Sequence, residues 1–303
     1  MSKYTRFNLV LVLLTTAIFA VYNFAGEMRW SAVEVIVSLI LFTSLMVTYA
    51  GMADAAIIVR LQRWVGKRIL YIFLPSIALA LVTYAYIAFA EKVTLRAFVT
   101  TSIYLFIPTL LLWLDRKYPQ RFNWRNLIAF LIIWWMIEWK LLPGTKIPPR
   151  QGVSFFQLVA LNIAVFSFLV VRGLEGVGYR LLPNRGEWGR ACIYLGLFCT
   201  FFAIPIGLWT GFIQPTMKWQ PFWQFPFILL GIFFFTGIPE EFIFRGILYN
   251  LLARTIQGKH AQWIALASSS VIFGLAHLNN HTPPQVEVHL LGFQYMVPWA
   301  YLI

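Results

Sequence analysis

Charged residues are scarce in this sequence, and acidic residues are the scarcest of them. Only 12% of the 303 residues are charged, whereas 60% are hydrophobic, and the mean hydropathy is +0.74. A soluble domain typically carries about 25% charged residues. The composition therefore excludes an ordinary soluble protein and places most of the chain in a lipid bilayer.

Cysteine is also nearly absent, with Cys192 and Cys199 as the two examples. Their spacing puts them on one face of a helix and does not fit the CxxC pattern of a metal or redox pair. We interpret both as small buried residues of a membrane helix. The sequence thus offers no cysteine-based chemistry.

Apolar segments long enough to cross a membrane recur along the chain. About 20 residues cross a bilayer core of about 30 Å. The first segment lacks a signal-peptide cleavage site and is followed by further segments, so we expect it to be a retained anchor. The sequence predicts an all-α polytopic membrane protein with about 9–10 transmembrane helices. The expected spans are 7–25, 31–53, 69–90, 97–114, 127–142, 154–171, 190–213, 222–254 and 262–278, with a last one from near 286.

The net charge of +13 is explained by topology. If the N-terminus is cytoplasmic, the basic residues gather in alternate loops on the cytoplasmic side, for example at 60–68 and 116–125. This is the bias of the positive-inside rule, and such loops also contact anionic lipid headgroups. We therefore predict a multi-pass protein of the cytoplasmic (inner) membrane, with its N-terminus inside and membrane lipids as partners. No nucleic-acid partner is needed.

The chain divides by chemistry into two regions. Residues 1–189 form an N-terminal transmembrane region of unknown role, whose isolated acids Glu34, Asp54 and Glu138 lie near predicted span ends and have a structural interpretation. Residues 190–303 hold every unusual polar feature. We interpret this second region as the functional core, incomplete at its C-terminus.

Two adjacent glutamates, Glu240 and Glu241, interrupt the apolar segment 222–254. Because a charged residue near the bilayer centre costs about 2.5–3.5 kcal/mol, such a pair indicates a function. Glu241 and Arg245 have the i, i+4 spacing and order that favour a helical ion pair. Glu240 points about 100° away around an α-helix, and Pro239 disturbs helical hydrogen bonding just before it. A carboxylate in this setting suits a general base that accepts a proton from water.

A second element is Phe273-Gly-Leu-Ala-His277, near the end of the predicted span 262–278. At about 1.5 Å per residue, Glu240 and His277 both lie roughly 21–22 Å from the loop that joins their helices. Small residues at 265–270 allow close helix approach. On antiparallel neighbouring helices, the two side chains are predicted to meet at equal depth.

The motif Glu-Glu-x-x-x-Arg at 240–245, followed by Phe-x-x-x-His at 273–277, resembles the CPBP family. Its members are the CAAX proteases and bacteriocin-processing enzymes, which are glutamate-type intramembrane endopeptidases. The resemblance covers roughly 190–303. It implies hydrolysis without a cofactor, in which Glu240 activates water with help from His277 while Glu241 and Arg245 support the site. It also implies a membrane-associated peptide or protein substrate, such as a prenylated C-terminus or a bacteriocin precursor.

A third motif of that family, His-x-x-x-Asn (or Asp), is absent from the sequence. Gln285 and Phe293 stand four residues after His281 and His289. The chain ends within an apolar segment, so we expect the protein to continue beyond Ile303. Because each lost oxyanion donor costs about 10²–10³ in rate, we expect this truncated chain to have little activity by itself.

Three alternatives remain open at this point. Two glutamates and a histidine are legitimate zinc ligands, although the sequence lacks HExxH. A proton-coupled transporter could use the same carboxylates as a relay, but no second broken span accompanies them as transporter repeats would predict. The third alternative is a non-catalytic bacteriocin-immunity or scaffold protein, which the missing third motif favours.

Overall fold

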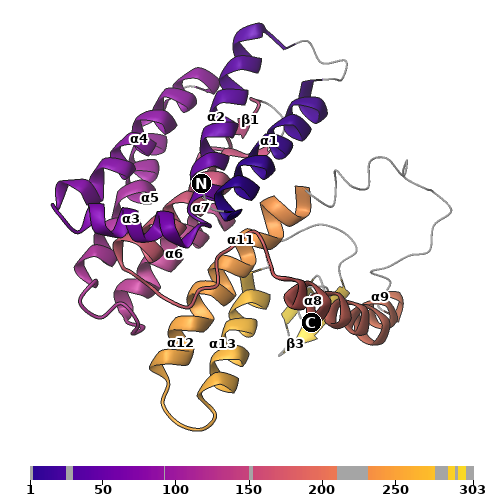
Figure 1. Ribbon diagram of the computed structural model, residues 1–303. Helices are drawn as coiled ribbons and strands as arrows, with labels where there is room; N and C mark the ends of the chain where they lie inside the picture. Colours follow the sequence, from indigo (N-terminus) through magenta and orange to yellow (C-terminus); the bar gives the residue numbers. More distant parts are fainter. Residues whose placement is uncertain are drawn as a thin grey trace. The chain divides into compact units, whose positions relative to one another are not determined.

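The structure is a computed structural model that describes residues 3–24, 30–91, 93–149, 153–209, 231–276, 286–290 and 293–297. Most of these residues are helical (Figure 1). The contacts divide the chain into two compact units, Met1–Leu182 with Leu230–Thr255, and Pro183–Leu229 with Ile256–Ile303. The predicted division by chemistry at residue 189 stays a prediction.

The predicted all-α polytopic class is confirmed. Within the described ranges, five helical segments are long and apolar enough to span a membrane, fewer than the 9–10 expected. The predicted spans 127–142, 154–171 and 262–278 correspond to the helical segments Trp124–Glu138, Phe155–Val171 and Ala261–Ala276, each of fewer than 18 residues, and 222–254 is described only in part. The five segments are α1 (Lys3–Phe24), α2 (Ala32–Gly51), α4 (Leu70–Ala90), α5 (Leu95–Leu114) and Arg185–Trp209.

A buried helix lies at the centre of the first unit. It consists of α7 (Phe155–Ala164) and the π-helical η1 (Val165–Val171), and of its residues only Gln157 is exposed. A helix that is apolar all round is expected to be buried, and α2, α5 and α6 (Trp124–Glu138) contact it. The helices around it carry exposed apolar side chains, such as Leu13, Ile40 and Leu81. An apolar outer surface of this extent suits lipid rather than water.

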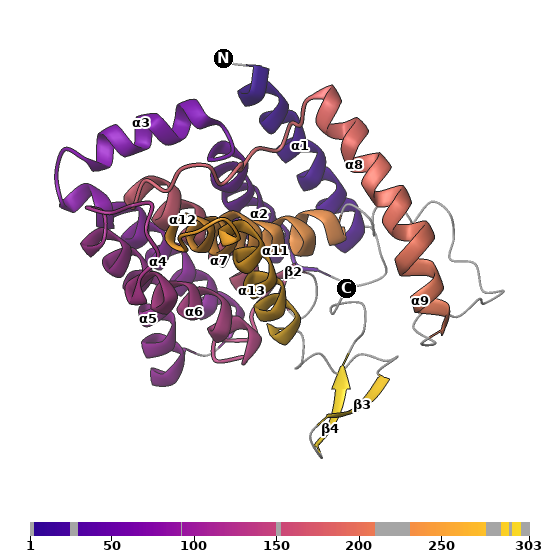
Figure 2. The same ribbon diagram turned by 90° about the horizontal axis from the view of Figure 1, so that it is seen from below.

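One short helix runs across the bundle instead of along it. This helix, α3 (Ala55–Val65), crosses the direction of α4 in both views (Figures 1 and 2). It begins where the carboxylate of Asp54 accepts a hydrogen bond from the Ala56 N–H (2.9 Å). Arg60 and Arg63 are exposed on it. A short amphipathic helix with exposed basic residues is typical of a membrane interface.

The second unit contains α8 (Arg185–Phe198), the π-helical η2 (Cys199–Ala203), α9 (Ile204–Trp209) and α13 (Ala261–Ala276). The prediction that both cysteines are buried is wrong, because Cys192 is exposed and Cys199 half-buried. Cys192 lies on α8, and Cys199 directly follows it. No residue of α8 is buried against other parts of the protein.

The helical span predicted from near 286 is also wrong. Strands β3 (Val286–Leu290) and β4 (Phe293–Val297) pair antiparallel there. The sequence of β3 explains the difference, since Val286, Val288 and Leu290 alternate with Glu287 and His289. Alternation with period two indicates a strand. A second small pair, β1 (Lys146–Ile147) with β2 (Val153–Ser154), lies in the first unit.

Candidate functional site

Three of the four predicted site residues lie on one uninterrupted helical segment of the first unit. The segment consists of η4 (Phe233–Gly237), α11 (Ile238–Glu240), η5 (Glu241–Tyr249) and α12 (Asn250–Thr255), and we call it the site helix. The backbone stays helical on both sides of Pro239, as at Glu240 (φ −65°, ψ −49°). Instead of a break, the hydrogen bonding widens to the i→i+5 pattern in η4 and η5. Such π-helical turns occur frequently at functional sites.

The predicted ion pair on the site helix is confirmed. Nη1 of Arg245 lies 3.1 Å from Oε1 of Glu241. Both side chains project from the first unit, with exposed fractions of 70% for Arg245 and 57% for Glu241. Glu240 precedes this pair at the end of α11 and is half-buried. The site helix thus carries two carboxylates and one guanidinium within six residues.

An extended segment, residues 173–182, follows η1 and runs along the site helix. Val177 packs so closely on Gly246 that a Cβ there would meet Val177 Cγ1 at 2.8 Å. Further along, the rings of Tyr179 and Phe242 meet edge to face, with centroids 5.0 Å apart. The Tyr179 hydroxyl donates to the carbonyl of Tyr49 on α2 (3.0 Å). We call this extended segment the strap, because it ties the site helix to α2.

The contacts with α2 show how deep Glu240 lies in the first unit. Near the middle of α2, Phe42 lies 5.9 Å from Phe235 between ring centroids. Phe242 is held by the strap near the end of the same helix, which is Gly51. Glu240 comes between these two contacts along the site helix, so it is level with the last turns of α2.

The fourth predicted residue, His277, lies outside the described residues. It directly follows Ala276, the last residue of α13, which belongs to the second unit. The predicted meeting of Glu240 and His277 at equal depth therefore stays a prediction. Among the residues that the structure describes, no three His, Cys, Asp or Glu side chains gather as a metal site requires. Because His277 and His281 lie outside the described residues, the expectation of metal independence also stays a prediction.

A polar cluster fastens the end of the site helix to the strap. The side-chain amide of Asn250 donates to the carbonyl of Glu175 (2.7 Å). Arg254 donates from Nη1 to Oε1 of Gln120 (2.6 Å), and the Gln120 amide in turn donates to the carbonyl of Gly173 (3.1 Å). These contacts join the loop 115–123, the strap and α12, which are remote in sequence. We call Gln120, Glu175, Asn250 and Arg254 the clamp.

A buried ion pair stabilises the loop that carries Gln120 of the clamp. Nη1 of Arg172, at the start of the strap, lies 2.9 Å from Oδ2 of Asp115, at the end of α5. Arg172 also donates to the carbonyls of Pro119 (2.8 Å) and Arg121 in the loop between α5 and α6. Burial lowers the pKa of Arg172 to about 10, and the charge of Asp115 acts against that decrease. The pair fixes the loop that carries Gln120.

Neither the clamp nor the buried ion pair was predicted from the sequence. Arg172 directly follows the apolar segment 154–171. Asp115 likewise follows the apolar segment that forms α5. Two opposite charges at the ends of spans on the same predicted side are a signal that could have suggested their pairing.

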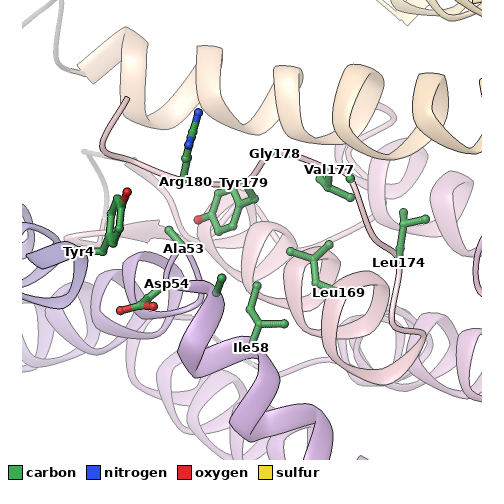
Figure 3. Close-up of a pocket in the computed structure, with 12 residues that line it drawn as sticks. Tyr4, Ala53, Asp54, Ile58, Leu169, Leu174, Val177, Gly178, Tyr179 and Arg180 are labelled. Atoms are coloured by element: carbon green, nitrogen blue, oxygen red, sulfur yellow. The ribbon is translucent and has the colours of Figure 1, made fainter. Parts of the chain in front are cut away.

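The strap also covers a pocket of about 490 Å³ at the start of α3 (Figure 3). Its wall is largely apolar and includes Ile58, Leu169 and Val177. Asp54 contributes a carboxylate that already accepts a hydrogen bond from the hydroxyl of Thr5 (2.6 Å). Volumes of this size are usual for sites that bind small molecules or side chains.

The fold and the helix with its paired acids define a class, a polytopic helical membrane protein with acidic side chains on a helix of the bundle. Residues 221–303 match the family model described as type II CAAX prenyl endopeptidase Rce1-like. The predicted resemblance to the CPBP family and its CAAX proteases is thereby confirmed over this range, which includes Glu240, Glu241, Arg245 and His277. No curated protein and no solved structure matched the chain.

Proposed function

We propose that this protein is a glutamate-type intramembrane endopeptidase that works without a metal ion. The observation that carries the proposal is the match of residues 221–303 to the Rce1-like family model. Within this range, one helix bears Glu240, Glu241 and Arg245. The proposed substrate is a membrane-anchored peptide or protein. A prenylated C-terminus agrees with the description of the family, and a bacteriocin precursor is the second substrate class to test.

In the proposed reaction Glu240 acts as the general base. Its carboxylate accepts a proton from a water molecule that it shares with His277, and the water oxygen attacks the carbonyl carbon of the scissile peptide bond. The C–N bond then breaks, and the proton passes from Glu240 to the departing amine nitrogen. The ion pair of Glu241 with Arg245 holds the neighbouring turn of the site helix in place.

We propose further that the N-terminus and the clamp face the cytosol. Thr5 at the start of α1 contacts Asp54 at the start of α3, so the N-terminus lies on the same side of the bundle as the exposed Arg60 and Arg63. The basic loop between α5 and α6 joins the clamp through Gln120. Because basic loops are retained in the cytoplasm, this side is the cytosolic one, from which a substrate would reach Glu240.

The first test is the substitution Glu240→Gln in the full-length protein, reconstituted in nanodiscs with a fluorogenic prenylated peptide. General acid–base catalysis contributes about 10²–10⁴-fold, so cleavage should fall by at least about 10²-fold. Glu91→Gln is the matched control, since Glu91 is exposed at the end of α4. Undiminished cleavage by the Glu240→Gln variant would overturn the proposal.

The second test concerns metal dependence and substrate class. Activity should survive exhaustive treatment with 1,10-phenanthroline, because no metal takes part in the proposed reaction. Loss of activity that added Zn²⁺ restores would instead make Glu240, Glu241 and His277 candidate ligands. Parallel assays with a non-prenylated peptide and a bacteriocin leader peptide would show which substrate class is cleaved.

A further inference from the structure

The strap lies in a definite register along the site helix. Its Val177 contacts Gly246, and two residues later Tyr179 contacts Phe242, so the two segments run in opposite directions. In the other direction, Glu175 precedes Val177 by two residues and contacts Asn250, which follows Gly246 by four. One further residue of the strap therefore corresponds to about two residues of the helix. This register puts Arg180 level with Glu240.

The direction of the Arg180 side chain agrees with the register. Figure 3 shows it turned away from the pocket and toward the helix above, whereas Asp54 lies on the other side of the pocket. The carboxylate of Asp54 accepts hydrogen bonds from the Thr5 hydroxyl and the Ala56 N–H. Arg180 is an exposed residue of the first unit. It can thus reach toward the half-buried Glu240 without leaving the strap.

We propose that Arg180 is a positioning residue of the candidate site, whose guanidinium holds the carboxylate of Glu240 in the orientation in which it accepts a proton from water. The inference rests on the proposed function. Its physical basis is charge as well as register, because Glu240, Glu241 and Arg245 together carry one net negative charge. Arg180 balances that charge from outside the helix. It also gives the N-terminal region, which lies outside the family match, a part in the reaction.

Kinetics of three variants of the full-length protein in nanodiscs test the role of Arg180. A charge-assisted hydrogen bond is worth about 1.5–3 kcal/mol, so Arg180→Ala should lower kcat about tenfold to a hundredfold with little change in KM. Arg180→Lys should restore most of that loss, which a purely structural residue would not show. Arg96→Ala, which removes another exposed positive charge at the start of α5, should behave as wild type. An Arg180→Ala variant as active as Arg96→Ala would overturn the inference.

Cross-linking tests the register without requiring hydrolysis. Cysteine pairs are placed at 180 and 240 or at 175 and 250, in a background with Cys192→Ser and Cys199→Ser, and treated with a short bifunctional methanethiosulfonate. Both pairs should link, because Asn250 contacts Glu175 and Arg180 is level with Glu240. The mismatched pair 180 and 250 is about 15 Å out of register along the helix and should not link.

The two experiments separate failure of this inference from failure of the proposed function. If wild type cleaves its substrate but the pair 180 and 240 does not link while 175 and 250 does, the inference about Arg180 is wrong and the endopeptidase stands. If the full-length wild type cleaves none of the three peptides, the proposed function fails and the positioning role fails with it, whichever cross-links form.

Discussion

Gly246 of the site helix and Val177 of the strap are in such close contact that no larger side chain fits between them. A Cβ built on Gly246 would lie 2.8 Å from Val177 Cγ1 and 3.6 Å from its carbonyl oxygen. Valine is stiff at χ1, so its methyl group cannot simply turn aside. The contact therefore sets the spacing between the strap and the helix that carries Glu240.

The substitution Gly246→Ala should weaken the first unit although alanine favours helices. Overpacking typically costs about 1–3 kcal/mol, which exceeds the gain of about 1 kcal/mol from the better helix former. Thermal unfolding in detergent should therefore move to lower temperature, and the added substitution Val177→Ala should restore it. The control is Gly196→Ala on α8, where nothing lies within 4 Å of the added Cβ. A Gly246→Ala variant as stable as that control would contradict the close approach.

Breaking the buried ion pair should be more costly than removing it altogether. Arg172→Met removes the nearer cation of the buried Asp115 carboxylate and leaves Arg125 at 3.8 Å. Breaking a buried ion pair typically costs about 3–5 kcal/mol. The double variant Arg172→Met with Asp115→Leu removes both charges and should recover part of this loss. Chemical unfolding of the single and double variants measures the difference. Equal stability of the single variant and wild type would show that the pair does not hold the loop 115–123.

The clamp should protect the strap from proteolysis. Gln120 accepts from Arg254 and from the Glu175 N–H and donates to the carbonyl of Gly173, so Gln120→Ala removes three hydrogen bonds to the strap and α12. At about 0.5–1.5 kcal/mol per hydrogen bond, local opening should become several-fold more frequent. Trypsin should then cut faster after Arg180, as mass spectrometry can follow. Gln157→Ala, at an exposed position of α7, is the matched control and should leave the rate unchanged.

The fold class could be predicted because bilayer thickness sets the length of apolar segments. The predicted spans 7–25, 31–53, 69–90 and 97–114 correspond to α1, α2, α4 and α5. The helix α3 was not predicted, since an interfacial helix of 11 residues has no long apolar run to mark it. The hairpin of β3 and β4 was missed because its overall apolarity was given more weight than its alternating pattern.

The site could be predicted only where its contacts are local in sequence. Glu241 and Arg245 are one helical turn apart, so their spacing alone indicates the pair. Asp115 and Arg172 are joined by a contact across 57 residues, and Gln120 and Arg254 across 134. Such contacts depend on how helices pack, which the sequence pattern does not specify. The register that brings Arg180 level with Glu240 is of the same kind.

The ion pair between Glu241 and Arg245 should matter for activity far more than for stability. Both side chains are more than half exposed in the first unit, and exposed pairs are typically worth about 0.2–1 kcal/mol. Glu241→Gln and Arg245→Gln should therefore unfold close to wild type while cleaving substrate at least about tenfold more slowly, because the turn beside Glu240 is no longer fixed. If the two residues act as one unit, the double variant should be no slower than the slower single variant. Losses of activity that multiply in the double variant would show instead that each residue acts on the substrate separately.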